Sequence, residues 1–261
     1  MNSYNQTDQR IHYLSQILAK TGRTFVEKKE DDSHTNLGFV PSTNWLETHW
    51  IESPKGKIKL VLRITDFCIL WLDEKGEAFQ TISTVLKTQE EVEDQLKKGI
   101  KEAGLDPEGF SEPLHFEIPD YTFVGKPFQM INRHNLDEWT QWRTLANEAC
   151  GKVLGILDAG VPIRIWPHHF DTGIYVQATD EPGIGFGLAM KDEMAGAPYF
   201  YMSGYPSEGK LDYSEAPELT SGRWEITEGF KGAILPLTEY EEVQEALDQY
   251  IEQSIQWFLR Q

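Results

Sequence analysis

Residues 79–100 read FQTISTVLKTQEEVEDQLKKGI, and residues 230–251 read FKGAILPLTEYEEVQEALDQYI. Aligned without gaps, the two segments share seven identities in 22 positions. Each begins as an apolar, strand-like run and passes into a helix with apolar residues at helical spacing. The match predicts an internal duplication. The alternative is that junctions between strands and helices resemble one another because they share capping chemistry.

Similar elements are expected around both segments. We expect helices over 11–20 and 139–157 and strands over 45–51, 57–64, 67–72, 79–86, 163–170, 184–190, 198–203 and 224–237. Gly22 is a plausible helix C-cap and Asp137 a plausible N-cap, while Thr88 and Thr238 each open a capping box. Short turns between strands favour antiparallel pairing. The sequence thus predicts an α+β fold of two similar helix–four-strand–helix halves, with mainly antiparallel sheet covered by helices.

The strongest candidate boundary is residues 106–135, which contain four prolines and little periodicity. We interpret this segment as a Pro-rich connector between a first half, 1–105, and a second half, 136–261. The two halves are expected to form one compact unit, with a groove between them along a pseudo-twofold axis.

The charge and composition exclude several kinds of partner. The chain carries 42 acidic and 24 basic residues, a net charge of −18, and no basic stripe that would favour nucleic acid or anionic membranes. The sequence shows no apolar run long enough to span a bilayer, and from its polar first residues we expect no signal peptide. Cys68 and Cys150 are interpreted as buried thiols. We therefore expect a cytoplasmic, bacterial protein, with its oligomeric state undetermined.

The run Trp166-Pro167-His168-His169-Phe170-Asp171 is the sharpest local feature. On a strand, His169 and Asp171 would share one face. Three interpretations remain open: a divalent metal site, a His–Asp pair for general base catalysis, or a sheet-edge histidine followed by an Asx-turn. The candidate metal ligands are His168, His169, Asp171, His49 and Glu47.

Aromatic residues suggest a ligand pocket as an alternative to simple packing. Tyr199 and Tyr201 would lie on one face of a strand, near Tyr205. The glycine-rich residues 183–187 lack the spacing of a phosphate-binding loop. The predicted ligand-binding set is Trp166, His169, Asp171, Tyr199 and Tyr201.

The chain resembles, nearly end to end, an uncharacterised bacterial family, number five thousand nine hundred and ninety-six of the domain-of-unknown-function series. The segments that carry the resemblance are Leu14 to Lys20, 115–120 with Pro127-Phe128, the Trp139–Trp142 helix, Trp166 to Asp171, 199–206 and 233–237. The resemblance implies a fold and no mechanism. The histidine pair is not uniform in the family, so Phe170-Asp171 is the feature it supports.

These observations predict a protein that binds a small molecule or a partner protein in a groove between its halves. One alternative is a metal-dependent, hydrolase-like enzyme that uses the His-His-Phe-Asp run. Another is a structural protein whose aromatic residues lie at an oligomer interface. No catalytic residue is assigned, and a divalent metal is the only cofactor suggested.

Overall fold

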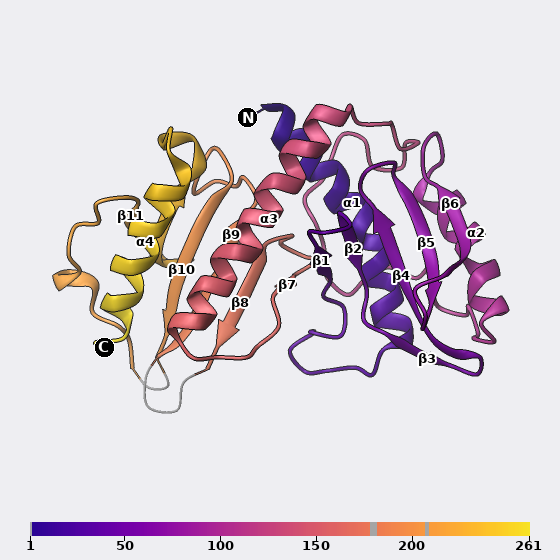
Figure 1. The fold of residues 1–261 in the computed structure, drawn as a ribbon, viewed down its shortest axis with the longest axis horizontal. Helices are drawn as coiled ribbons and strands as arrows, with labels where there is room; N and C mark the ends of the chain where they lie inside the picture. Colours follow the sequence, from indigo (N-terminus) through magenta and orange to yellow (C-terminus); the bar gives the residue numbers. More distant parts are fainter. Residues whose placement is uncertain (1, 178–181, 207–208) are drawn as a thin grey trace. The chain divides into compact units, whose positions relative to one another are not determined.

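The computed structural model describes residues 2–177, 182–206 and 209–261 (Figure 1). In these residues, helices and two antiparallel sheets confirm the predicted α+β class. The chain divides into two compact units. We call Asn2–Trp142 with Arg164–Phe170 the N-terminal unit, and Arg143–Ile163 with Asp171–Gln261 the C-terminal unit.

The N-terminal unit contains one sheet in the order β1-β2-β4-β5-β6, with β3 paired to β4. Its elements are α1 (Asn2–Phe25), β1 (Gly38–Val40), β2 (Trp45–Glu47), β3 (Ile51–Ser53), β4 (Gly56–Arg63), β5 (Cys68–Asp73), β6 (Ala78–Ser83), α2 (Gln89–Glu102) and β7 (Arg164–Ile165). Helix α3 (Arg133–Ile156) begins in this unit and ends in the other.

Strand β4 contributes buried residues to both faces of the N-terminal sheet. Ile58, Leu60 and Leu62 are buried on one face, and the elements α1 and β4 are in contact. Val61 is buried on the opposite face in a cluster with Leu70 and Leu72.

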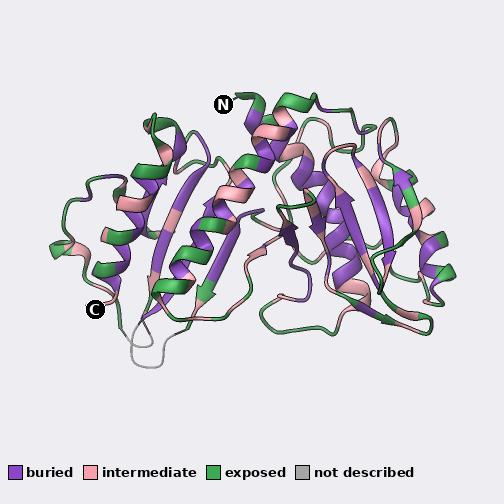
Figure 2. Cartoon of the chain, in the orientation of Figure 1, coloured by how far each residue is buried: buried purple, intermediate pink, exposed green. Residues whose placement is uncertain are grey.

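Helix α1 is buried along most of its length, as its colouring in Figure 2 shows. Helix α2 approaches the sheet closely because Gly99 leaves room for the Trp71 indole. The sheet is therefore covered by helices, as predicted.

The C-terminal unit contains the strand order β11-β12-β10-β9-β8. Its elements are the second half of α3, β8 (Thr172–Val176), β9 (Gly183–Ala189), β10 (Tyr199–Tyr205), the 3-10 helix η1 (Tyr213–Glu215), β11 (Arg223–Ile226), β12 (Lys231–Pro236), the 3-10 helix η2 (Leu237–Glu239) and α4 (Val243–Phe258). All of the strand pairs in this order are antiparallel.

Helix α4 covers β10 and β12, and it lies in front of the sheet in Figure 1. The buried Tyr250 hydroxyl donates to Ala233 O at 2.7 Å, which satisfies both polar groups. Gly204 lies against the Phe258 ring, where a larger residue would clash. Both units thus combine an antiparallel sheet with helical cover; the internal duplication itself stays a prediction.

One of the two capping boxes is confirmed. Thr88 Oγ1 accepts from Glu91 N at 3.2 Å, and Glu91 Oε2 accepts from Thr88 N at 2.8 Å. The prediction at Thr238 is wrong because that residue lies within η2, and α4 begins only at Val243. Its N-cap, Glu242, makes no side-chain capping bond.

Two other predicted caps are also wrong. Helix α1 continues past Gly22 to Phe25, and a Cβ at Gly22 would clash with His34 O. The glycine therefore serves close packing. Helix α3 begins at Arg133 and not near Asp137; Asn132 Oδ1 accepts from Asn135 N at 2.9 Å and caps this end.

Several strand and burial predictions need correction. The run 45–51 is divided between β2 and β3, and 224–237 forms the hairpin β11–β12 followed by the start of η2. Cys150 is buried as expected, but Cys68 is partly exposed.

Residues 106–135 belong to the N-terminal unit. Among the described residues, no helix has the length and apolarity needed to cross a membrane.

Candidate functional site

The Trp-Pro-His-His run is a turn and not a strand. Strand β7 ends at Ile165, and Phe170 N donates to Trp166 O at 2.6 Å to close the turn. Phe170 has a left-handed φ of 57°. Since Pro167 cannot donate to a ladder and Phe170 reverses the chain, strand alternation does not apply here. The predicted common face of His169 and Asp171 is therefore wrong.

This turn is anchored to α1 by one carbonyl. Pro167 O accepts from His12 Nε2 at 2.8 Å and from Gln16 Nε2 at 2.9 Å. His12 Nδ1 lies 2.8 Å from Tyr121 Oη, and its ring stacks on Phe170 with centroids 4.9 Å apart. Because a carbonyl only accepts, Nε2 carries a proton and, in the neutral ring, Nδ1 accepts from the phenol. The buried His12 is thus a structural anchor for the turn.

The five predicted ligand-binding residues are divided between the two units. Trp166 and His169 belong to the N-terminal unit, where Trp166 is half-buried and His169 is exposed. Asp171, Tyr199 and Tyr201 belong to the C-terminal unit. In that unit Tyr201 Oη donates to Asp171 Oδ2 at 2.5 Å, whereas Tyr199 Oη donates to Asp192 Oδ2 at 2.6 Å.

The Asp171–Tyr201 pair is packed tightly. Burial, and then the Asp171 carboxylate, raise the pKa of Tyr201 well above its ordinary value. Gly173 and Gly187 provide the space for the phenol, since a Cβ at either position would lie within 3 Å of its oxygen. Within the described part of the chain, Asp171 Oδ1 is buried with no hydrogen-bond partner. The pair is a buried polar contact on the sheet.

The glycine-rich residues 183–187 form the start of β9, as predicted, and support tyrosine rings. Built Cβ atoms at Gly183, Gly185 and Gly187 would approach Tyr175, Tyr205 and Tyr201 respectively. The alternate glycines thus let tyrosine side chains from the neighbouring strands approach β9 closely. Tyr175 and Tyr205 meet edge to face, with centroids 5.5 Å apart.

The proposed metal ligands do not form a common site. His49 Nε2 lies 2.9 Å from Ser33 O and 2.8 Å from Asn36 Oδ1, and Glu47 Oε2 pairs with Lys59 Nζ at 2.5 Å. Burial lowers the pKa of His49. Throughout the described ranges, no three His, Cys, Asp or Glu side chains gather to hold a metal ion. The set His168, His169, Asp171, His49 and Glu47 therefore has no metal-site geometry.

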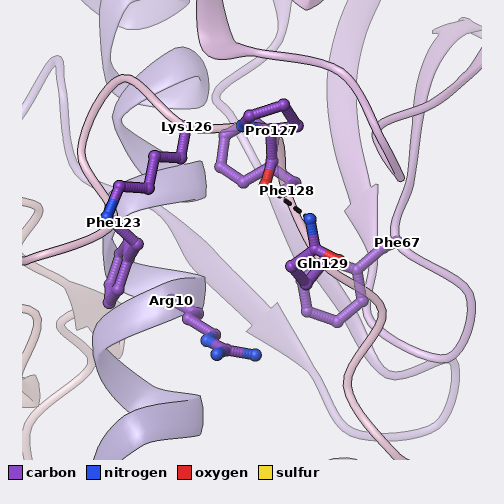
Figure 3. Close-up of a pocket in the computed structure, with 7 residues that line it drawn as sticks. All are labelled: Arg10, Phe67, Phe123, Lys126, Pro127, Phe128 and Gln129. Atoms are coloured by element: carbon purple, nitrogen blue, oxygen red, sulfur yellow. Dashed lines mark hydrogen bonds between the residues drawn. The ribbon is translucent and has the colours of Figure 1, made fainter.

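A pocket in the N-terminal unit is formed by residues that the sequence did not identify (Figure 3). The cavity itself is small, about 30 Å³; the space reaches about 330 Å³ only when the adjoining open solvent is included. Its lining comes from α1, the turn between β4 and β5, and the Pro-rich segment. The residues are Arg10, Phe67, Phe123, Lys126, Pro127, Phe128 and Gln129.

Arg10 is the central charge of this pocket. Its side chain extends from α1 into the space between Phe123 and Phe67 (Figure 3), with Cζ 6.0 Å from the Phe123 ring centroid. Within the described ranges no carboxylate lies at ion-pair distance from it. Lys126 Nζ donates to Thr122 O at 2.7 Å. The pocket thus places two cationic groups beside an apolar wall.

The pocket wall is held by unusual backbone. Phe67 is buried and has a φ of 53°, while its carbonyl accepts from Thr84 N and Thr84 Oγ1. Leu86 N donates to Phe128 O, and Phe128 N donates to Lys87 O, each at 2.8 Å. A left-handed phenylalanine costs about 1–2 kcal/mol, so the fold holds this ring in place against a local preference.

The sequence contained one weak signal for this pocket. Aromatic residues recur in the Pro-rich segment, at Phe116, Tyr121, Phe123 and Phe128, although a free linker would be poor in them. They indicate that the segment packs against the fold. Arg10 carried no signal because it lies far from the segment in the chain.

Comparison with known proteins does not place the chain in a family. No family model, curated protein or solved structure matches it. The resemblance to the uncharacterised bacterial family therefore stays a hypothesis.

Proposed function

We propose that this protein binds a small organic anion in the pocket at Arg10. The carboxylate or phosphate of the ligand pairs with the Arg10 guanidinium and the Lys126 ammonium. Its apolar part contacts Phe123 and Pro127, the accessible apolar side chains of the lining. The proposed site is the pocket at Arg10 and not the groove between the halves that the sequence predicted. The type of function is the one predicted, which is binding with no catalytic residue assigned.

The observation that carries the proposal is the unpaired Arg10. The chain has 42 acidic residues against 24 basic ones, yet the described residues give this arginine no carboxylate partner. A guanidinium presents a planar set of donors that suits carboxylate and phosphate. An apolar wall beside a few polar groups is typical of ligand pockets.

The net charge and the cysteines bear on the class of ligand and on the cellular compartment. The acidic chain supports a ligand other than nucleic acid, whose binding needs a broad basic surface. The free thiols Cys68 and Cys150 support a reducing, cytoplasmic compartment. The metal-dependent alternative gains no support from the ligand geometry. The oligomer alternative stays a prediction that light scattering on the purified protein tests.

Calorimetric titration with benzoate tests the proposal, with benzamide as the uncharged analogue. We expect benzoate to bind more tightly than benzamide, and raised salt to weaken benzoate binding. Arg10→Gln is expected to lower benzoate affinity about tenfold or more, because a charge-assisted contact is lost. Arg260→Gln, an exposed arginine of the C-terminal unit, is the matched control. Equal binding of benzoate by the Arg10 variant and the parent protein would overturn the proposal.

A further inference from the structure

The pocket at Arg10 has exposed apolar neighbours. Among the described residues of the N-terminal unit, the large exposed hydrophobic side chains are Trp50, Leu86, Val124 and Met130. Three of these four are direct neighbours of pocket-lining residues: Val124 follows Phe123 and Met130 follows Gln129 in the chain, and the Leu86 backbone N donates to Phe128 O. Exposed apolar groups that gather in one place mark interaction surfaces more often than isolated ones do.

Leu86 is exposed against two local preferences. Its side chain is 71% exposed, and its φ is 63°, a conformation that favours glycine or asparagine. Stability of the isolated chain gives no reason for a leucine here. A leucine held out at the edge of a pocket suits contact with another molecule.

The same surface carries cations. Lys87 Nζ donates to Ser83 O at 2.6 Å, and Lys126 Nζ donates to Thr122 O. The described residues supply neither ammonium group with a carboxylate partner. With Arg10, they are three cationic side chains without a carboxylate partner among the described residues at or beside the pocket, on a chain of net charge −18. The complementary partner is acidic.

We propose that Arg10, Leu86, Lys87, Val124, Lys126 and Met130 form a docking surface for a polypeptide segment with an apolar residue flanked by carboxylates. The inference rests on the proposed function, since the pocket receives the apolar residue and Arg10 pairs with a flanking carboxylate. A small acid would fill the hollow and leave the apolar edge in water. A peptide segment covers both, as an anchor residue with surrounding contacts does at protein interfaces.

Fluorescence anisotropy tests this with a labelled, capped five-residue peptide that has phenylalanine between paired aspartates. We expect saturable binding that is lost when the aspartates become lysines and weakened at least tenfold when the phenylalanine becomes alanine. Leu86→Asn and Met130→Gln are expected to weaken peptide binding several-fold while benzoate binding stays unchanged. Asparagine tolerates the left-handed conformation, so the Leu86 variant should fold. Ile226→Thr, an exposed position of the C-terminal unit, is the control.

The failures of the two proposals are distinguishable. In one outcome, benzoate binding depends on Arg10, the peptide binds no more tightly than benzoate, and the Leu86 and Met130 variants bind the peptide as the parent protein does. That result contradicts the docking surface and leaves the small-anion site supported. If neither ligand depends on Arg10, both proposals fall. If vesicles of anionic phospholipid bind in an Arg10-dependent way and the peptide does not, the surface recognises lipid and the inference is wrong.

Discussion

The Tyr201 hydroxyl donates a 2.5 Å hydrogen bond to Asp171 Oδ2, while the described residues give the buried Asp171 Oδ1 no hydrogen-bond partner. Tyr201→Phe removes the donor and leaves Asp171 buried without it. We expect a loss of about 1–3 kcal/mol in the free energy of unfolding, the usual result of stranding a buried polar group. Urea denaturation measures it. Tyr205→Phe is the control, because Tyr205 is half exposed, and an equal loss in both variants would contradict this account.

A buried ion pair ties α1 to α2. Lys20 Nζ lies 2.8 Å from Glu93 Oε1, and the two side chains are 10% and 4% exposed. Lys20→Met leaves the glutamate buried without its cation, so we expect a loss of about 3–5 kcal/mol in unfolding free energy. The double variant Lys20→Met, Glu93→Leu should recover much of that loss, since neither charge remains. Chemical denaturation of both variants checks this; a double variant no more stable than the single one contradicts it.

The glycines Gly99 and Gly151 are expected to respond in opposite ways to alanine. A Cβ at Gly99 would lie 2.9 Å from Trp71 Nε1 and closer still to other atoms of the sheet, whereas Gly151 of α3 has open space. Gly99→Ala should therefore cost about 1–3 kcal/mol through overpacking. Gly151→Ala should stabilise by up to about 1 kcal/mol through helix propensity. Thermal unfolding of the two variants measures these changes in stability. A Gly99 variant more stable than the parent protein would show that α2 can move away from the sheet without a loss of stability.

Acid is expected to weaken the N-terminal unit. Burial lowers the pKa of His34 and of His49 below the ordinary value of 6.5. The unfolded chain therefore takes up protons first as the pH falls, so this stabilisation is complete above about pH 6.5 and is lost progressively below it. We expect a lower urea midpoint at pH 5.5 than at pH 7.5. For His34, nearby Asp32 raises the pKa and so reduces this loss of stability, while His115 lowers the pKa of His34 and increases the loss.

His49→Gln isolates the contribution of one ring. The glutamine amide can replace the His49 Nε2 contact with Ser33 O but does not titrate. The variant should show a smaller difference between the two pH values than the parent protein. An unchanged difference would assign the acid sensitivity to other groups. His134→Gln, at an exposed position, is the matched control.

Local chemistry made part of the fold predictable. The strand-to-helix segment at 79–100 and its cap at Thr88 followed from residues close in sequence. The same pattern failed at Thr238 because η2 occupies the positions where a capping box would form. Gly22 was misassigned for a different reason: its close neighbour His34 lies beyond the helix, and sequence spacing does not show such an approach.

The candidate site was less predictable than the fold. The run Trp166 to Asp171 looked like a strand because its side chains are aromatic, but Pro167 and the left-handed Phe170 determine its path. The pocket at Arg10 draws on three segments that are far apart in the chain. Arg10 becomes a candidate ligand-binding residue only in the structure, where the described residues place no carboxylate at ion-pair distance from it.

The alternate glycines of β9 affect the order in which the C-terminal unit forms. A strand whose every second residue lacks a side chain has little intrinsic tendency to become extended and loses much backbone entropy when it does. The rings that cover Gly183, Gly185 and Gly187 belong to the strands on either side. We therefore infer that β9 gains its structure from its neighbours, so that a strand in the interior of this sheet is completed after the strands that flank it.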